Sequence, residues 1–199
     1  MTKRSTKNRK TRTRLLDTAS KLFRSQGFHA TGLDQILRRS RTPKGSLYHY
    51  FPGGKDQLAI ETLQYVACEQ GQTMSAIFSS QIDPLETLQT FFDHTAENLL
   101  MSDFRDGCPI AAVTLEVASD RPSVREACRQ GFQTWLEVLV RHLNRAGLSE
   151  ARAKSIATLV LASLEGALIL SRAHKSVEPL NIITRELAQV IQASLAKHN

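Results

Sequence analysis

The sequence has few cysteines, and their spacing does not indicate a structural site. The 199 residues include only Cys68, Cys108 and Cys128, an odd number with no Cys-x-x-Cys pair. This pattern indicates neither a disulfide framework nor a zinc site, and a reducing cytoplasm is the simplest compartment. The P-loop, the dinucleotide-binding glycine motif and the His-Glu-x-x-His motif are also missing, so we expect no cofactor and no metal.

Long hydrophobic runs and strand-like alternation are missing as well. Residues 1–10 contain no apolar stretch, so we expect no signal peptide. The most apolar run, residues 156–170, is interrupted by Ser163, Glu165 and Gly166. It is too short to span a bilayer, so we expect a buried bundle helix and no membrane partner. Because apolar residues recur at helical spacing elsewhere, the predicted fold class is all-α.

Acidic residues are scarce in the first 55 positions. That stretch has 14 lysines and arginines against Asp17 and Asp34, a net charge of +12, and the remainder carries −5. A positive excess confined to one region is typical of nucleic-acid binding. A membrane-surface protein could show the same bias, but these basic residues lack the large apolar face of an interfacial helix.

Residues 31–51 are predicted to form two short helices and a tight turn. Leu33, Ile36 and Leu37 give the first helix one apolar face, and Thr31 is its expected N-cap. Thr42 is the expected N-cap of the second helix, with Pro43 in its first turn.

The second of these helices has an apolar side and a polar side. Its inward residues are Leu47, Tyr50 and Phe51, and its outward residues are Lys44, Gly45, Ser46, Tyr48 and His49. Cations and hydroxyls can reach phosphates and base edges, and a glycine allows close approach of the DNA backbone. The pair therefore fits a helix-turn-helix that reads the major groove. An ordinary helical hairpin with a solvated polar face is the alternative.

A longer set of residues reinforces the DNA-binding interpretation. It comprises Thr31, Gly32, Leu33, Ile36, Pro43, Lys44, Gly45, Ser46, Leu47, Tyr48, His49, Tyr50, Phe51, Lys55 and Leu58, preceded by Arg14, Ala19, Phe23, Gly27 and Phe28. This set resembles the DNA-binding signature of TetR-type transcriptional repressors over the first quarter to third of the chain. The resemblance implies a helix-turn-helix protein that binds a double-stranded DNA operator.

The predicted DNA-contacting residues come from this face, the basic N-terminus and the start of the next helix. They are Arg4, Arg12, Thr31, Gly32, Arg41, Thr42, Lys44, Gly45, Ser46, Tyr48, His49 and Lys55. Lys55 opens a long helix, where it and the first backbone N–H groups could hold a phosphate. The alternative for Lys55 is a free surface lysine.

About nine helices in three segments are predicted. Residues 1–10 are expected to form a basic flexible arm, either a solubilising tail or a DNA-binding extension. Residues 11–55 form the DNA-binding domain, and residues 56–199 form a regulatory and dimerisation domain. Asp83 with Pro84 predicts one helix start, and Ser123 with Glu126 predicts a second through a capping box.

The second domain has more long apolar helices than a spacer requires, which suggests a ligand pocket and a dimer interface. Aromatic and soft residues mixed with a few polar groups suit a pocket, although each is more often plain core. The candidate pocket residues are Phe91, Phe92, Met101, Phe104, Cys108, Trp135, Leu139 and His142. The last two helices could form a two-fold four-helix interface or pack within one chain, with candidate residues Leu159, Ser163, Leu170, Ile183, Leu187, Val190 and Ile191.

Two short motifs refine the resemblance. Phe-Pro-Gly-Gly-Lys at residues 51–55 and Gly-Cys-Pro-Ile-Ala-Ala-Val-Thr-Leu-Glu-Val at residues 107–117 resemble the LmrA/YxaF branch of the TetR family. That resemblance implies a homodimer that represses efflux or detoxification genes. It also implies release of the DNA by a flat, mainly apolar aromatic effector.

Two other classes of protein fit the sequence less well. A cysteine-dependent enzyme would need Cys108 paired with His94 or His142, but their spacing gives no support for a nucleophile and base. A non-specific nucleoid-type protein would bind phosphates alone and would not need so large an apolar second domain. Sequence-specific regulation with a palindromic operator is therefore the favoured function.

Overall fold

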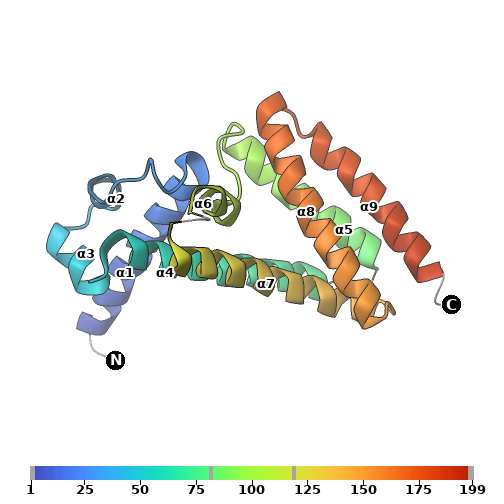
Figure 1. Cartoon of the computed structure of the whole chain (residues 1–199), viewed down its shortest axis with the longest axis horizontal. Helices are drawn as coiled ribbons and strands as arrows, with labels where there is room; N and C mark the ends of the chain where they lie inside the picture. Colours follow the sequence, from blue (N-terminus) through green and yellow to red (C-terminus); the bar gives the residue numbers. More distant parts are fainter. Residues whose placement is uncertain (1–2, 81–82, 118–119, 197–199) are drawn as a thin grey trace. The chain divides into compact units, whose positions relative to one another are not determined.

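The computed structural model describes residues 3–80, 83–117 and 120–196, and the side chains of residues 3–8 and of Ser80 are not described. Within these ranges all regular structure is helical, and nine helices follow one another along the chain (Figure 1). The predicted all-α class and helix number are confirmed.

The chain forms two compact units whose bounds differ from the predicted domains. Unit 1 comprises residues 1–67 and 109–131, and unit 2 comprises residues 68–108 and 132–199. The predicted boundary after residue 55 followed the linear order of motifs. It could not anticipate that residues 109–131 pack with the N-terminal helices.

Unit 1 contains the short helices of the helix-turn-helix. Its helices are α1 (Lys3–Gln26), α2 (Leu33–Ser40), α3 (Lys44–Tyr50), the first part of α4 (Gly54–Ser80), α6 (Pro109–Val117) and the first part of α7 (Pro122–Arg145). Its core side chains include Phe23, Phe28, Ile36, Leu47 and Phe51, all fully buried. Helix α1 packs against both α2 and α6, so a helix from the second half of the chain contributes to this core.

The predicted flexible arm is wrong for residues 3–10, because α1 already begins at Lys3. This segment has no apolar periodicity, which is why it was predicted to be mobile. It also has no proline or glycine, and lysine and arginine are good helix formers. Once the buried residues from Leu15 onward fix the helix, extending it toward the N-terminus costs little.

Two of the predicted N-caps are also wrong. Gly32 is the N-cap of α2, while Thr31 is buried and its hydroxyl donates to the Gly27 carbonyl at 2.6 Å. Pro43 is the N-cap of α3, and the Thr42 hydroxyl donates to the Ser40 carbonyl at 3.3 Å. Both threonines therefore satisfy carbonyls of the preceding turn instead of the N–H groups of the following helix.

Two further helix starts were predicted from caps in the second half of the chain. Asp83 is confirmed as the N-cap of α5 (Pro84–Met101), where its carboxylate accepts from the Leu85 N–H at 2.8 Å. The predicted capping box at Ser123 is wrong, because α7 begins one residue earlier, at Pro122. Glu126 instead accepts hydrogen bonds from Arg129 and Gln130.

Unit 2 is built from longer, more apolar helices. It contains α5, the later parts of α4 and α7, α8 (Glu150–His174) and α9 (Glu178–Ala196). Helix α9 packs against both α5 and α8. The fully or nearly fully buried side chains of unit 2 include Phe92, Leu99, Ile156, Val160 and Leu180.

Candidate nucleic-acid interface

Helix α3 separates its apolar and polar side chains as predicted. Leu47 and Phe51 are fully buried, and they fix the helix against the rest of unit 1. Lys44, Gly45, Tyr48 and His49 are exposed and Ser46 is half-buried. We call these last five residues the reading face. Tyr48 is 46% exposed, so it is accessible from outside the protein.

The turn between α2 and α3 adds cations beside the reading face. Arg38, Arg41 and Lys44 line one shallow surface depression together with Asp34, Leu37, Thr42 and Pro43. Arg41 is the C-cap of α2 and has a left-handed backbone, with φ 51° and ψ 45°. A non-glycine residue in this conformation costs free energy, so an exposed arginine there suggests a role outside folding.

Two of the predicted DNA residues have buried side chains. Thr31 is fully buried and Thr42 is 6% exposed, so neither residue presents a side chain for contact with DNA in this structure. The error came from counting every polar residue of the motif as outward-facing. Gly32 is exposed, and no atom lies within 4 Å of the Cβ position that a larger residue would add.

Arg4 and Arg12 of α1 were both predicted to contact DNA, and the structure describes the side chain of Arg12 alone. Arg12 is exposed, but its guanidinium pairs with Glu61 and lies 5.7 Å from the centre of the Phe51 ring. It therefore bridges α1 to the beginning of α4. The side chain of Arg4 lies outside the described part of the chain.

Lys55 is held more tightly than a free surface lysine. It is half-buried, with its Nζ 4.3 Å from the centre of the Phe28 ring and 3.5 Å from the His29 carbonyl oxygen. Burial lowers the pKa of Lys55, and the nearby positive charge of Arg121 lowers it further, against the opposing effect of Glu116 and Asp56.

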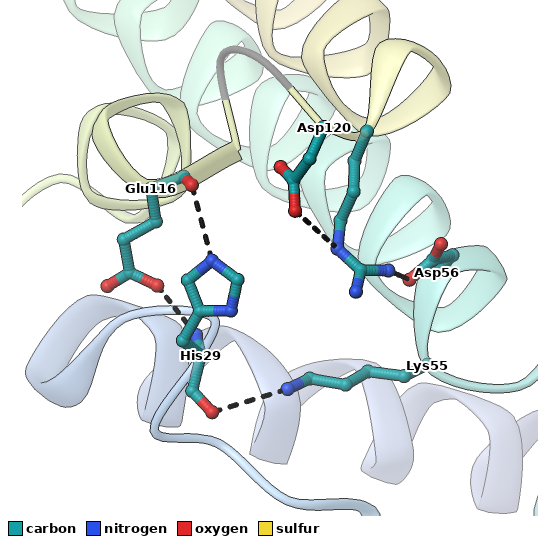
Figure 2. A network of polar contacts seen from close by, with 6 residues as sticks. His29, Lys55, Asp56, Glu116 and Asp120 are labelled. Carbon is teal, nitrogen blue, oxygen red and sulfur yellow. Dashed lines mark hydrogen bonds and ion pairs between the residues drawn. The ribbon is translucent and has the colours of Figure 1, made fainter.

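Sequence analysis missed several residues of unit 1. Arg38 and Arg39 are exposed in the last turn of α2, and their position just before the predicted turn was a signal that they adjoin the reading face. His29 and Glu116 form a polar network with Lys55, and Arg121 lies beside it, paired with Asp56 and Asp120. Figure 2 shows these contacts. No local spacing could have revealed this network, because Glu116 lies 87 residues from His29.

In unit 2, some of the predicted pocket residues lie together and others do not. The Phe78 ring stacks on His142 at 4.8 Å between ring centres and meets Phe91 edge-on at 5.8 Å, and Phe91 contacts Phe92. Burial lowers the pKa of His142, and Arg145 lowers it further. Trp135 and Leu139 are also buried. Sequence analysis missed Phe78 as the centre of this ring cluster.

Three other predicted pocket residues lie at or beyond the end of α5. Met101 is 82% exposed, so it does not line a buried pocket in this structure. Phe104 is half-buried in a left-handed turn with φ 57°. Cys108 is half-buried and its thiol donates a hydrogen bond to Glu165, whose pKa burial raises to about 7.

The predicted dimer residues also divide into two groups. Leu159 and Leu170 are 43% and 50% exposed on α8, and Ser163, Ile183 and Val190 are half-buried. Leu187 and Ile191 are buried within the chain, so their assignment to an outer interface is wrong. Periodicity identified their stripe but could not show that α5 and α8 already cover it. Ile169 and Ile182, which were not predicted, are exposed instead.

Helix α8 extends beyond the apolar run of residues 156–170 at both ends. Its 25 residues include a window with a mean hydropathy of 1.6, so length and composition alone would allow it to cross a membrane. The core helix of a soluble protein passes the same test. Buried residues such as Ile156, Val160 and Leu164 pack α8 inside unit 2.

The fold and the motifs agree with the comparisons to known proteins. Residues 15–62 match the model of the TetR family of bacterial regulatory proteins. Residues 84–186 match the C-terminal domain of LmrA/YxaF-like transcriptional regulators. The chain therefore belongs to the TetR family of DNA-binding transcriptional regulators, and its second half to the LmrA/YxaF-like branch.

Individual relatives support the same assignment. The chain is 35% identical over 181 residues to the uncharacterised regulator YxaF of Bacillus subtilis, an alignment that covers 91% of this chain and 95% of YxaF. It is 36% identical over 169 residues to LmrA of Bacillus subtilis, covering 85% and 90% of the two chains. A solved TetR regulator from Rhodobacter sphaeroides shares the fold, with a TM-score of 0.81 at 23% identity over 89% of this chain and 96% of the other. These relatives are transcriptional regulators and not enzymes.

Proposed function

We propose that this protein is a homodimeric, cytoplasmic repressor that binds a palindromic operator and releases it when a small, mainly apolar effector binds in unit 2. The observation that carries the DNA part is the reading face of α3, which exposes Tyr48 and His49 while Leu47 anchors the helix. An exposed aromatic ring and cations on one short helix suit contact with base edges and phosphates.

The size of the reading face and the exposed residues of α8 support the proposed dimer. Seven residues of α3 can read only a few base pairs, and two-fold readers place a second helix one or more DNA turns away. Leu159, Ile169 and Leu170 lie within three turns of one helix and are all about half exposed. A second copy that covers them would remove their exposed apolar side chains from water.

The effector is proposed to bind near the aromatic cluster of unit 2. Phe78, Phe91 and Phe92 supply apolar ring surface, and His142 supplies a polar group whose lowered pKa favours the neutral form. Such a lining favours a flat apolar molecule over a strongly charged one. The expected coupling between effector and operator is about 1 to 3 kcal/mol, roughly 5- to 150-fold in affinity, so partial release is as consistent with the proposal as complete release.

The experiment that tests this function is selection of genomic fragments by the purified protein at about 150 mM salt, a concentration at which non-specific binding is weak. Footprinting of the winning fragments should show two half-sites in inverted orientation. Recovery of sequence-random fragments would favour the nucleoid-type alternative and contradict the proposal.

Salt dependence provides an independent measurement on the same fragments. If a dimer contacts about 6 to 10 phosphates, the affinity should fall about 10³- to 10⁵-fold between 50 and 200 mM salt. A nearly flat response would contradict a role for the cationic surface formed by Arg38, Arg41 and Lys44.

A further inference from the structure

The segment that joins α1 to α2 is held from outside by α6. We call residues 27–31 the joining turn. The Glu116 carboxylate accepts a hydrogen bond from the backbone N–H of His29 at 2.6 Å. The His29 ring nitrogen Nε2 lies 3.2 Å from the Glu116 carbonyl oxygen. Because this carbonyl lies in the last turn of α6, where helix carbonyls lack intrahelical donors, His29 also caps α6.

Gly27 allows Glu116 to come this close. Its φ is +81°, and a Cβ added there would lie only 1.8 Å from Glu116 Oε1. Gly27 therefore ends α1 in a left-handed conformation and leaves room for the carboxylate directly against the main chain. The close contact therefore depends on two residues far apart in the sequence, Gly27 and Glu116.

Two cations hold the other side of the joining turn. Lys55, in the first turn of α4, and Arg121, just before α7, lie 4.3 and 5.2 Å from the centre of the Phe28 ring. Arg121 also pairs with Asp56 at 2.5 Å. Figure 2 shows Glu116 and Lys55 reaching His29 from different elements.

The joining turn determines how α2 follows α1, because the buried Thr31 and the N-cap Gly32 lead directly into α2. Glu116 lies near the C-terminal end of α6. The N-terminal end of α6, at Pro109, follows directly on Cys108, which is the last residue of the 68–108 stretch of unit 2. A displacement that reaches α6 through the chain therefore acts on the joining turn through Glu116.

We propose that Glu116 is a positioning residue that transmits movement of α6 through the joining turn to the helix-turn-helix, and so controls operator affinity. This inference adds a regulatory step to the proposed function, and its operator-affinity readout rests on that function. If the Glu116–His29 contact only stabilised the joining turn locally, its loss would destabilise the turn, but operator affinity would not depend on the position of α6.

The coupling can be tested without knowing the effector by displacing α6 through a packing change. Gly131 lies in α7, and a Cβ there would lie 2.6 Å from Ile110 Cδ1 in α6. Cδ1 is the end of a flexible side chain, so rotation of Ile110 can absorb the single methyl group of Gly131→Ala, the milder variant. Gly131→Val adds two further methyl groups against the fully buried Ile110, so we expect this variant to displace α6. Gly71→Ala is the matched control, because its Cβ would make ordinary contacts of 3.5 Å or more with Thr134 and Trp135.

Each glycine variant is made with Glu116 present and with Glu116→Ala. Glu126→Ala controls for the loss of a carboxylate, because Glu126 is exposed and pairs only locally, with Arg129 and Gln130. The two readouts are affinity for the selected operator fragment and hydrogen exchange of the amides in residues 27–33. The exchange readout requires no DNA.

With Glu116 present, Gly131→Val should lower operator affinity about tenfold and increase exchange in residues 27–33. In the Glu116→Ala background, the same substitution should change neither readout by more than about twofold, because contacting networks are non-additive. Equal effects in both backgrounds, or no effect in either, would overturn the proposal. If the wild-type chain selects no specific fragment, the proposed function fails, and the exchange measurement still decides the role of Glu116.

Discussion

The two units expose opposite kinds of surface on similar helical scaffolds. Unit 1 buries Leu47 and Phe51 behind a short helix that exposes cations, hydroxyls and Tyr48. Unit 2 buries its own aromatic cluster but leaves Ile169 and Leu170 of α8 about half exposed. A cationic face suits a polyanion, and an apolar strip suits another protein surface. The same helix-packing rules thus produce two faces that fit different partners.

The largest expected effect is on the apolar face. Leu170→Glu would place a charge in the proposed interface, where an unpaired buried charge is costly, so we expect the dimer to weaken by about 3 kcal/mol, or more than 100-fold. Sedimentation or light scattering over a range of concentrations measures the change. Leu115→Glu is the matched control because Leu115 is 78% exposed on α6, in unit 1. A dimer that survives Leu170→Glu unchanged would contradict the assignment of α8.

The next effect concerns the cationic face. Replacing Tyr48 or His49 by Ala should cost about 1 to 3 kcal/mol of operator affinity if the side chain touches a base. Both side chains are exposed, so thermal unfolding should change little. Unchanged affinity in both variants, measured by titration of the selected fragment, would remove α3 from the recognition site.

A smaller effect tests the apolar character of the interior of unit 2. Burial raises the pKa of Glu165 to about 7, above the value near 4.5 of an unfolded chain. The folded protein therefore binds a proton that the unfolded chain has lost, and stability should fall as the pH rises from about 4.5 through 7. A pKa raised from 4.5 to about 7 corresponds to at most about 3 kcal/mol at pH 8. Because Glu165 is partly exposed, solvent screening reduces this value, and we expect the wild-type chain to be less stable than Glu165→Gln by about 1 to 2 kcal/mol, with no difference near pH 4.

Urea unfolding of the two chains at both pH values measures that difference. Taking the difference between them removes the contributions of other titrating groups, such as His142. Equal stability at pH 8 would show that water reaches Glu165 and that this part of unit 2 is less apolar than we infer.

The helix-turn-helix was predictable because its evidence is local. Ile36 and Leu47, both buried, mark the inward sides of their helices, and Asp83 with Pro84 shows where α5 begins. The N-terminal extent of α1 was not predictable in the same way. It depends on propagation of an anchored helix and not on a pattern in residues 3–10.

The remaining errors share one physical cause, which is that periodicity identifies an apolar stripe but not what covers it. Leu187 and Ile191 fitted an interface stripe, yet helices of the same chain bury them. Likewise, Glu116 was part of a recognisable motif, but its partner His29 lies 87 residues away. Contacts of this kind are set by the tertiary fold, so spacing along the chain does not reveal them.

The central claim is that α3 approaches DNA closely, and Gly45→Ala tests it most directly. This variant also has the smallest expected change in stability. Gly45 is exposed, and a Cβ there would have no atom within 4 Å in the protein. Gly45→Ala should therefore stabilise the chain by about 0.5 to 1 kcal/mol, because glycine is unfavourable in a helix.

The measurement is operator affinity and thermal stability of Gly45→Ala on the same preparation. Affinity should fall about tenfold, which corresponds to about 1.4 kcal/mol, while stability stays the same or rises. Full operator affinity with unchanged or increased stability would contradict the claim, because it would mean that no DNA approaches the surface where the new methyl group stands.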